Sequence, residues 1–185
     1  MTTITAQDLN RRLADDIDNA FADLVRLLQD GIYSGTLQLT RNRHDAQDVT
    51  QETFVRAYRA LTKYDSDRIR GLELRAWVWT IAINLCRNRA RSQARRPEVL
   101  GLAIEQPAPN GDPAAAASES ADRAEWRQWL SQLNEPQRNA VVLHHVVGLP
   151  HNEIANITGR NPSTTRSDLR RGLAALRTII EEEPS

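Results

Sequence analysis

The sequence has a single cysteine, Cys86, among its 185 residues, so no disulfide can form within the chain. It also lacks any apolar run close to the roughly 18 residues that a membrane span requires. Its first residues do not combine a basic start with an apolar stretch, so we expect no secretion signal. These absences predict a cytoplasmic chain that does not insert directly into a membrane.

Signatures of catalysis are also missing: the sequence has no Gly-rich phosphate loop and no nucleophile motif. His144, His145 and His151 lie close in sequence, but no further ligand stands at a suitable spacing for a metal site. Cys86 lies among apolar helix neighbours, which favours a small core residue over a nucleophile. We therefore expect no enzyme activity, no cofactor, no bound metal and no small-molecule substrate.

The formal net charge is zero, which by itself disfavours binding to nucleic acid. The charge is unevenly distributed, however. Residues 1–96 carry 16 basic and 12 acidic side chains, residues 97–136 carry 2 and 7, and residues 137–180 carry 6 and 2. Two basic segments thus flank an acidic one, and this order favours two DNA-facing modules with an acidic spacer between them.

Helical periodicity dominates the sequence, and no stretch sustains the alternation typical of a strand. Between the helical segments, residues 97–122 contain four of the eight prolines and an alanine run, which predicts a flexible acidic linker. The expected fold class is all-α, with a helical bundle in residues 1–96 and a helix-turn-helix module in residues 123–185. The expected helices span about 17–28, 32–40, 44–61, 74–94, 124–133, 136–146, 151–157 and 162–180.

The helix expected at 44–61 has an inner face of small and apolar residues and an outer face that changes from acidic to basic. Its motif Asp45-Ala46-x-Asp48-x-x-Gln51-Glu52-x-Phe54 resembles region 2.2 of the sigma-70 superfamily, in particular its extracytoplasmic-function group (group IV) of RNA polymerase sigma factors. The resemblance implies that this helix docks on the β′ coiled coil of core RNA polymerase. The implied contact residues are Asp48, Gln51, Glu52, Val55 and Arg59.

In the helix expected at 74–94, Trp79 and Ile83 lie outside the main apolar arc and need a second partner, either a neighbouring helix or a nucleic acid. The end of this helix then becomes strongly basic, with no acidic residue among its arginines. This favours contacts to phosphates, and a solvated helix end is the alternative. The arginines are Arg87, Arg89, Arg91, Arg95 and Arg96.

The pattern Arg75-Ala76-Trp77…Ile81-Ala82-x-Asn84-Leu85 resembles regions 2.3–2.4 of the same family, which hold the melted −10 element of a promoter. An aspartate common in the family is missing around Arg91-Ser92. In relatives, the loop before this helix holds a flipped-out base, and here that loop would be residues 65–72. The implied DNA contacts are Arg68, Arg70, Trp79, Arg87, Arg89, Arg91 and Arg95.

Near the C-terminus, Ala155, Gly159 and the helix start Asn161-Pro162 form a helix-turn-helix pattern. The segment resembles region 4.2 of the family, which binds the −35 element. Asp168 replaces a common arginine and would repel phosphate, which weakens the expected binding, and apolar positions of the family are taken by Thr158, Arg160 and Thr165. The residues expected to face DNA are Ser163, Thr164, Arg166, Ser167, Arg170 and Arg171.

Taken together, these resemblances imply a sigma factor that binds the β′ coiled coil and the β flap of core RNA polymerase, recognises −35 and −10 promoter elements and assists melting. They also imply an anti-sigma factor as a partner. Two other readings stay open: a stand-alone helix-turn-helix regulator with an N-terminal sensor domain, and a protein–protein adaptor whose arginines are solvated. An enzyme is a distant third.

Overall fold

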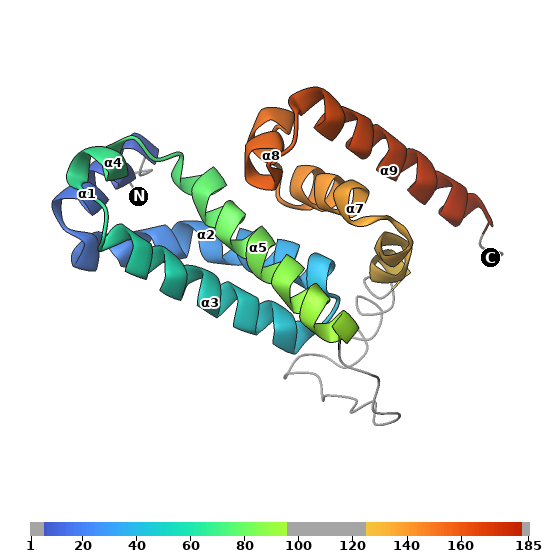
Figure 1. Ribbon diagram of the computed structural model, residues 1–185, viewed down its shortest axis with the longest axis horizontal. Coiled ribbons are helices and arrows are strands. Elements are labelled where there is room, and N and C mark those ends of the chain that lie inside the picture. Colours follow the sequence, from blue (N-terminus) through green and yellow to red (C-terminus); the bar gives the residue numbers. More distant parts are fainter. Residues whose placement is uncertain (1–5, 96–124, 183–185) are drawn as a thin grey trace, which may run out of the picture.

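The computed structural model describes residues 6–95 and 125–182, and every regular element in these ranges is a helix. This confirms the all-α prediction with two helical modules. The predicted linker, residues 97–122, lies outside the described residues. The first module contains α1 (Ala6–Asp15), α2 (Ile17–Thr40), α3 (Arg43–Leu61), α4 (Ser66–Arg70) and α5 (Leu74–Arg95) (Figure 1). The second contains a helical segment at 125–132, α7 (Glu135–Val141), the π-helix η1 (Val142–Val146), α8 (His151–Thr158) and α9 (Pro162–Glu182).

Polar side chains cap the starts of several helices and thereby fix where they begin. The side chain of Asp16 accepts a hydrogen bond from the backbone N–H of Asn19 at the start of α2. Asn42 does the same for α3, and Asn134 does so for α7. A cap of this kind stabilises a helix by about 1 kcal/mol because it satisfies an N–H that has no partner within the helix.

The structure differs from the sequence-based expectation at three elements of the first module. Residues 17–40 form one helix rather than two, because Leu28 and Ile32, on either side of the expected break, both pack into the core. The predicted loop 65–72 contains the short helix α4, and the N-terminal helix α1 was not anticipated. The side chain of Asn10 donates to the backbone carbonyls of Ile69 and Leu72, at 3.1 and 2.7 Å, and joins these two elements.

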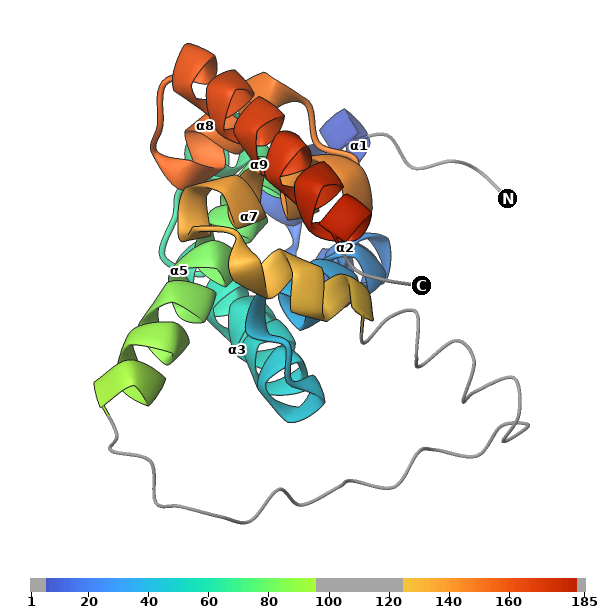
Figure 2. The ribbon, with the colours of Figure 1, turned by 90° about the vertical axis from the view of Figure 1, so that its right-hand side faces the viewer.

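Helices α2, α3 and α5 lie side by side and form the body of the first module (Figures 1 and 2). The inner face of α3 is buried against its neighbours as the periodicity predicts. Its small side chains allow close approach, and Thr36 of α2 lies within 3.2 Å of Thr50 of α3. The buried inner-face residues are Ala46, Val49, Thr53, Ala57 and Leu61.

The two modules pack against each other through an apolar contact, so a linker is not their only connection. Trp79 of α5 is 1% exposed, and its ring occupies the space beside Gly35 of α2, next to Val147 of the second module. Arg75 donates to the backbone carbonyl of Val147 at 2.9 Å across the same boundary. Second-module residues that belong to the core cluster of the first module are Leu143, Leu149, Ile154 and Ile157.

Candidate nucleic-acid interface

The outer face of α3 presents the residues that the sequence predicts for polymerase docking. All five lie at the surface, and the apolar side chain of Val55 is 41% exposed. Glu52 pairs with Arg56 one turn later, at 2.7 Å. Because the opposite face of α3 is packed into the core, these residues face outward together. They are Asp48, Gln51, Glu52, Val55 and Arg59.

An apolar hollow lies at the far end of this face, which periodicity within α3 alone does not reveal. It is lined by Phe54, Val55, Tyr58 and Arg59 of α3 and by Phe21 of α2. The rings of Phe21 and Tyr58 meet edge to face with centroids 5.2 Å apart. The α2 side of this hollow is invisible to a helical wheel, because it depends on how α2 packs against α3.

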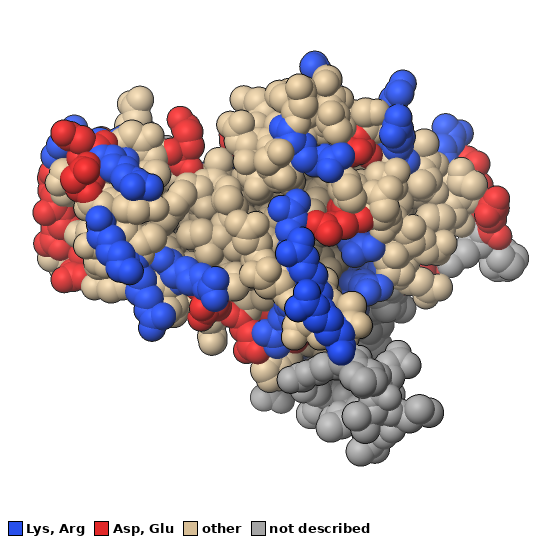
Figure 3. All heavy atoms as spheres, in the orientation of Figure 1, with Lys and Arg blue, Asp and Glu red and all other residues tan. Residues whose placement is uncertain are grey.

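The basic end of α5 contains four of the five arginines predicted to contact phosphate, and two of these four form ion pairs with other helices. Lys and Arg side chains gather along the C-terminal half of α5, with acidic side chains beside them (Figure 3). Arg87 pairs with Glu135 at 2.7 Å, and Arg89 pairs with both Asp45 and Asp48. Arg91 and Arg95 are exposed and form no ion pair within the described ranges, whereas Arg96 lies outside them. Helix geometry cannot show these pairings, because the carboxylates come from α3 and α7.

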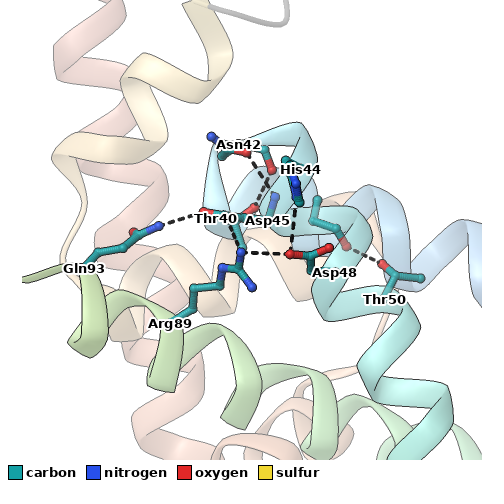
Figure 4. A network of polar contacts seen from close by, with 9 residues as sticks. Thr40, Asn42, His44, Asp45, Asp48, Thr50, Arg89 and Gln93 are labelled. Carbon is teal, nitrogen blue, oxygen red and sulfur yellow. Dashed lines mark hydrogen bonds and ion pairs between the residues drawn. The ribbon is translucent and has the colours of Figure 1, made fainter. Parts of the chain in front are cut away.

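The pairing of Arg89 connects α3 and α5, the two helices on which the sequence predicts polymerase and DNA contacts (Figure 4). Its Nη2 lies 2.6 Å from Asp45 and 3.0 Å from Asp48. Gln93, one turn further along α5, donates to the other oxygen of Asp45 at 2.7 Å. Burial alone would lower the pKa of Arg89, but the hydrogen bonds that its guanidinium donates to both carboxylates, together with their negative charges, outweigh burial and raise that pKa. Sequence analysis identified Asp48 and Arg89 separately and missed the roles of Asp45 and Gln93.

Trp79, predicted as a DNA contact, is buried between the modules and presents almost no surface. The prediction of a contact to DNA is therefore wrong for this arrangement of the modules. Trp79 and Ile83 instead fit the alternative expectation of a helix that is buried on two sides, because Ile83 is also only 1% exposed. The physical reason is that the second partner of these side chains comes from α2 and from the second module.

The segment before α5 holds its two predicted arginines at the surface. Arg68 lies over the ring of Tyr64, 3.7 Å from its centroid, in a cation–π contact. Arg70 pairs with Asp67 at 3.1 Å and with Asp15 of α1 at 3.2 Å. Both guanidinium groups remain exposed, but Arg70 shares its charge with two carboxylates, whereas Arg68 forms no ion pair within the described ranges.

The second module contains the predicted helix-turn-helix. Gly159 ends α8 with φ 66°, a left-handed conformation that favours glycine, and α9 follows after two residues. Thr165 and Leu169 hold α9 in the core, and their neighbours on the other side of the helix are accessible. The residues expected to face DNA all have accessible surface: Ser163, Thr164, Arg166, Ser167, Arg170 and Arg171.

The structure also corrects the expectation for Asp168. This residue is 8% exposed, and its carboxylate lies 2.9 Å from Nε of Arg160. Its charge is thus compensated inside the module, so it does not present an unpaired negative charge to phosphate. Arg160 and Asp168 both depart from the family pattern, and they compensate each other.

The remaining polar candidates are structural. Nδ1 of His144 lies 2.9 Å from the backbone carbonyl of Leu149, which ties the π-helix to the following turn. Within residues 6–95 and 125–182 no group of three His, Cys, Asp or Glu residues is placed to hold a metal ion. Burial raises the pKa of the Cys86 thiol to about 12, with a smaller contribution from Asp45, so the thiol stays protonated at neutral pH. No helix in the same two ranges is both long and apolar enough to span a membrane.

Comparison with known proteins agrees with this geometry. Residues 24–96 match the family model for Sigma-70 region 2, and residues 123–176 match that for Sigma-70, region 4. The chain is 31% identical over 179 residues to the RNA polymerase sigma-H factor of Pseudomonas aeruginosa, covering 92% of this chain and 91% of that one. The chain belongs to the sigma-70 family, in its extracytoplasmic-function group.

Two further comparisons place this sigma factor within its family. It is 33% identical over 165 residues to the ECF RNA polymerase sigma factor SigE of Mycolicibacterium smegmatis, which covers 88% of this chain and only 62% of the length of that relative. The solved structure of CnrH in complex with the cytosolic domain of CnrY is 25% identical, has a TM-score of 0.72, and covers 96% of this chain and 98% of CnrH. In this sigma factor, the region 2 match reaches from α2 to the end of α5, and the region 4 match includes the helix-turn-helix.

Proposed function

We propose that this sigma factor docks on the β′ coiled coil of core RNA polymerase through the outer face of α3 and thereby directs promoter-specific transcription. The proposal rests on the division of the α3 side chains between an exposed face and a buried face. Asp48, Glu52 and Arg59 lie at the surface, while every residue of the opposite face is packed into the core. A helix with charged and apolar groups exposed side by side suits a protein interface, because the rim carries charge and the centre is apolar.

The same proposal assigns promoter DNA to two basic surfaces. In the first module these are the exposed Arg91 and Arg95 of α5, together with Arg68 and Arg70 near α4. In the second module, Arg166 and its neighbours at the start of α9 would enter the major groove of the −35 element. Arginines at these places neutralise phosphates and would make the affinity for DNA salt-dependent.

Two further partners follow from the family. We infer that the second module also contacts the β flap of the polymerase, and that an anti-sigma factor holds the chain inactive. The relative CnrH was solved with the cytosolic domain of CnrY bound, which supports a protein partner of this kind. We infer that the protein acts in the cytoplasm, where it would meet core polymerase and promoter DNA, and that it binds these partners without catalysing a reaction.

Reconstitution with core polymerase tests the docking face. Run-off transcription from a promoter library should depend on the added chain, and the double variant Asp48→Lys, Glu52→Lys should lower it at least roughly tenfold, because two docking contacts become repulsive. The matched control, Asp30→Lys with Glu182→Lys, changes the net charge equally at exposed sites outside α3. Transcription that persists unchanged with the α3 double variant would contradict the assigned face.

A further inference from the structure

The shared guanidinium of Arg89 lies between a residue of the polymerase-docking face and the basic end of α5 that faces DNA. Nη2 lies within ion-pair distance of both Asp45 and Asp48, and the Arg89 side chain is 36% exposed. Asp48 is 41% exposed, whereas the side chain of Asp45 is only 11% exposed. One arginine therefore bridges a buried carboxylate and an accessible one (Figure 4).

The two carboxylates have different roles in this cluster. Asp45 is held from several directions: Asn42 accepts a hydrogen bond from its backbone N–H at 3.0 Å, and Gln93 donates to its side chain at 2.7 Å. Asp45 is thus a fixed anchor that positions Arg89. Asp48 is the accessible carboxylate of the pair, because it opens to solvent on the docking face. There it also lies 3.3 Å from His44.

A hollow of about 440 Å³ lies beside this cluster and is lined by both α3 and α5. It is lined by Asp48 and Glu52 from α3 and by Arg89 and Gln93 from α5. A group that approaches Asp48 from outside therefore reaches the Arg89 ion pair directly. Two carboxylates and one guanidinium leave this site with a surplus of negative charge, which disfavours a phosphate near Arg89 in the free chain.

We propose that the Asp45–Arg89–Asp48 cluster makes polymerase docking and DNA binding favour each other by sharing one ion pair. A basic group of the polymerase that pairs with Asp48 displaces Arg89 from that carboxylate, and the guanidinium, still anchored by Asp45, can then donate to a phosphate. A phosphate that binds Arg89 leaves Asp48 free for the polymerase, since coupling between two sites is reciprocal. This inference rests on the proposed function, because it takes α3 as the docking face and the end of α5 as a DNA surface.

Affinity measurements with core polymerase in a double-mutant cycle test the coupling. Arg89→Gln should tighten binding to core polymerase about threefold, the size expected for a partly exposed ion pair, because Asp48 no longer has an internal competitor. The gain should be absent in the Asp48→Asn background and in Arg89→Lys, which keeps the charge. Arg89→Gln that weakens binding, or that changes it equally in both backgrounds, would overturn the proposal.

A second double-mutant cycle, which combines Glu52→Gln with Arg89→Gln, is the matched control for the Asp48 cycle. Glu52→Gln removes the same charge from the same helix one turn later, but the ion-pair partner of Glu52 is Arg56. Its effect on polymerase affinity should therefore add to that of Arg89→Gln without coupling. If the Glu52 cycle is as strongly coupled as the Asp48 cycle, general charge rather than the shared ion pair explains the result. Thermal unfolding of each variant excludes a loss of fold as the cause.

A DNA-binding measurement on the free chain tests the coupling in the opposite direction. At low salt, the free Asp48→Asn chain should bind a fluorescein-labelled, mixed-sequence single-stranded DNA oligonucleotide about threefold more tightly than the wild type. This gain in affinity should be absent when Asp48→Asn is combined with Arg89→Gln. An Asp48→Asn chain that binds the oligonucleotide no better than the wild type overturns the release of Arg89. A wild-type chain that fails to bind core polymerase at all would instead refute the proposed function, so the two failures are distinguishable.

Discussion

At Gly35, α2 lies in close contact with α5 and with the second module. A Cβ atom at this position would overlap the ring of Trp79 and lie 3.0 Å from Val147. Gly31 lies one turn earlier in the same helix, and apart from its chain neighbours and its own helix backbone nothing lies within 4 Å of the place where its Cβ would be. Two glycines of one helix therefore have different physical roles, and only one of them is required by packing.

We expect Gly35→Ala to lower the free energy of unfolding by about 1–3 kcal/mol, because the added methyl group must displace a fully buried indole. Gly31→Ala should instead raise it by about 0.5–1 kcal/mol, since alanine restricts the unfolded chain and favours the helix. Urea unfolding followed by circular dichroism measures both. Equal effects of the two substitutions would show that the contact between Gly35 and Trp79 does not limit the packing.

At the scale of elements, α9 divides its surface between two roles. Thr165, Leu169 and Gly172 are buried, and Gly172 lets α9 approach α7 because a Cβ there would lie 2.9 Å from Val141. Arg166 and Arg170 are exposed near the start of α9. Arg177 is also exposed but pairs with Glu181 near the end of the same helix, at 2.8 Å. The N-terminal half of α9 thus carries the arginines that can reach DNA.

Arg166→Ala should weaken binding of the polymerase complex to a selected promoter duplex roughly tenfold and reduce the salt dependence by about one phosphate contact. Arg177→Ala removes an equal charge from the same helix and should leave both quantities at the wild-type level. Fluorescence anisotropy over a series of salt concentrations measures affinity and slope together. If both variants weaken binding equally, only the total charge of α9 is important, and the assigned DNA face is wrong.

For the whole molecule, the decisive feature is the apolar contact between the modules. Val147 follows the π-helix and packs against the core that contains Trp79, whereas its neighbour Val146 is 37% exposed. Arg75 and Arg87 add polar contacts to Val147 and Glu135 across the same boundary. Exposure of Trp79 to a ligand would require this contact to open.

Val147→Asp should separate the modules, because a carboxylate without a partner is costly in an apolar contact. Small-angle X-ray scattering of the free chain should then show a larger radius of gyration, and a quencher in solution should reach more of the tryptophan fluorescence. Val146→Asp is the matched control and should change neither. A Val147→Asp chain as compact as the wild type would show that the polar contacts hold the modules together by themselves.

Much of this architecture can be predicted from local patterns. The inner face of α3, the Asn134 cap and the turn at Gly159 all follow from helical periodicity and capping chemistry, which depend on neighbours a few residues apart. The same patterns identify the residues that face outward, because the outer face of an amphipathic helix follows from its inner one. The motifs of regions 2 and 4 lie on these elements, so the family resemblance also needed only local sequence.

The tertiary structure alone decided which of those outward residues meet a partner within the chain. The carboxylates that pair with Arg89 lie more than forty residues earlier, and the side chains that bury Trp79 come from α2 and the second module. Arg160 and Asp168 looked like two separate departures from the family pattern until the fold brought them together. Periodicity specifies the direction of a side chain from its own helix, whereas pairing and burial depend on what another element places there.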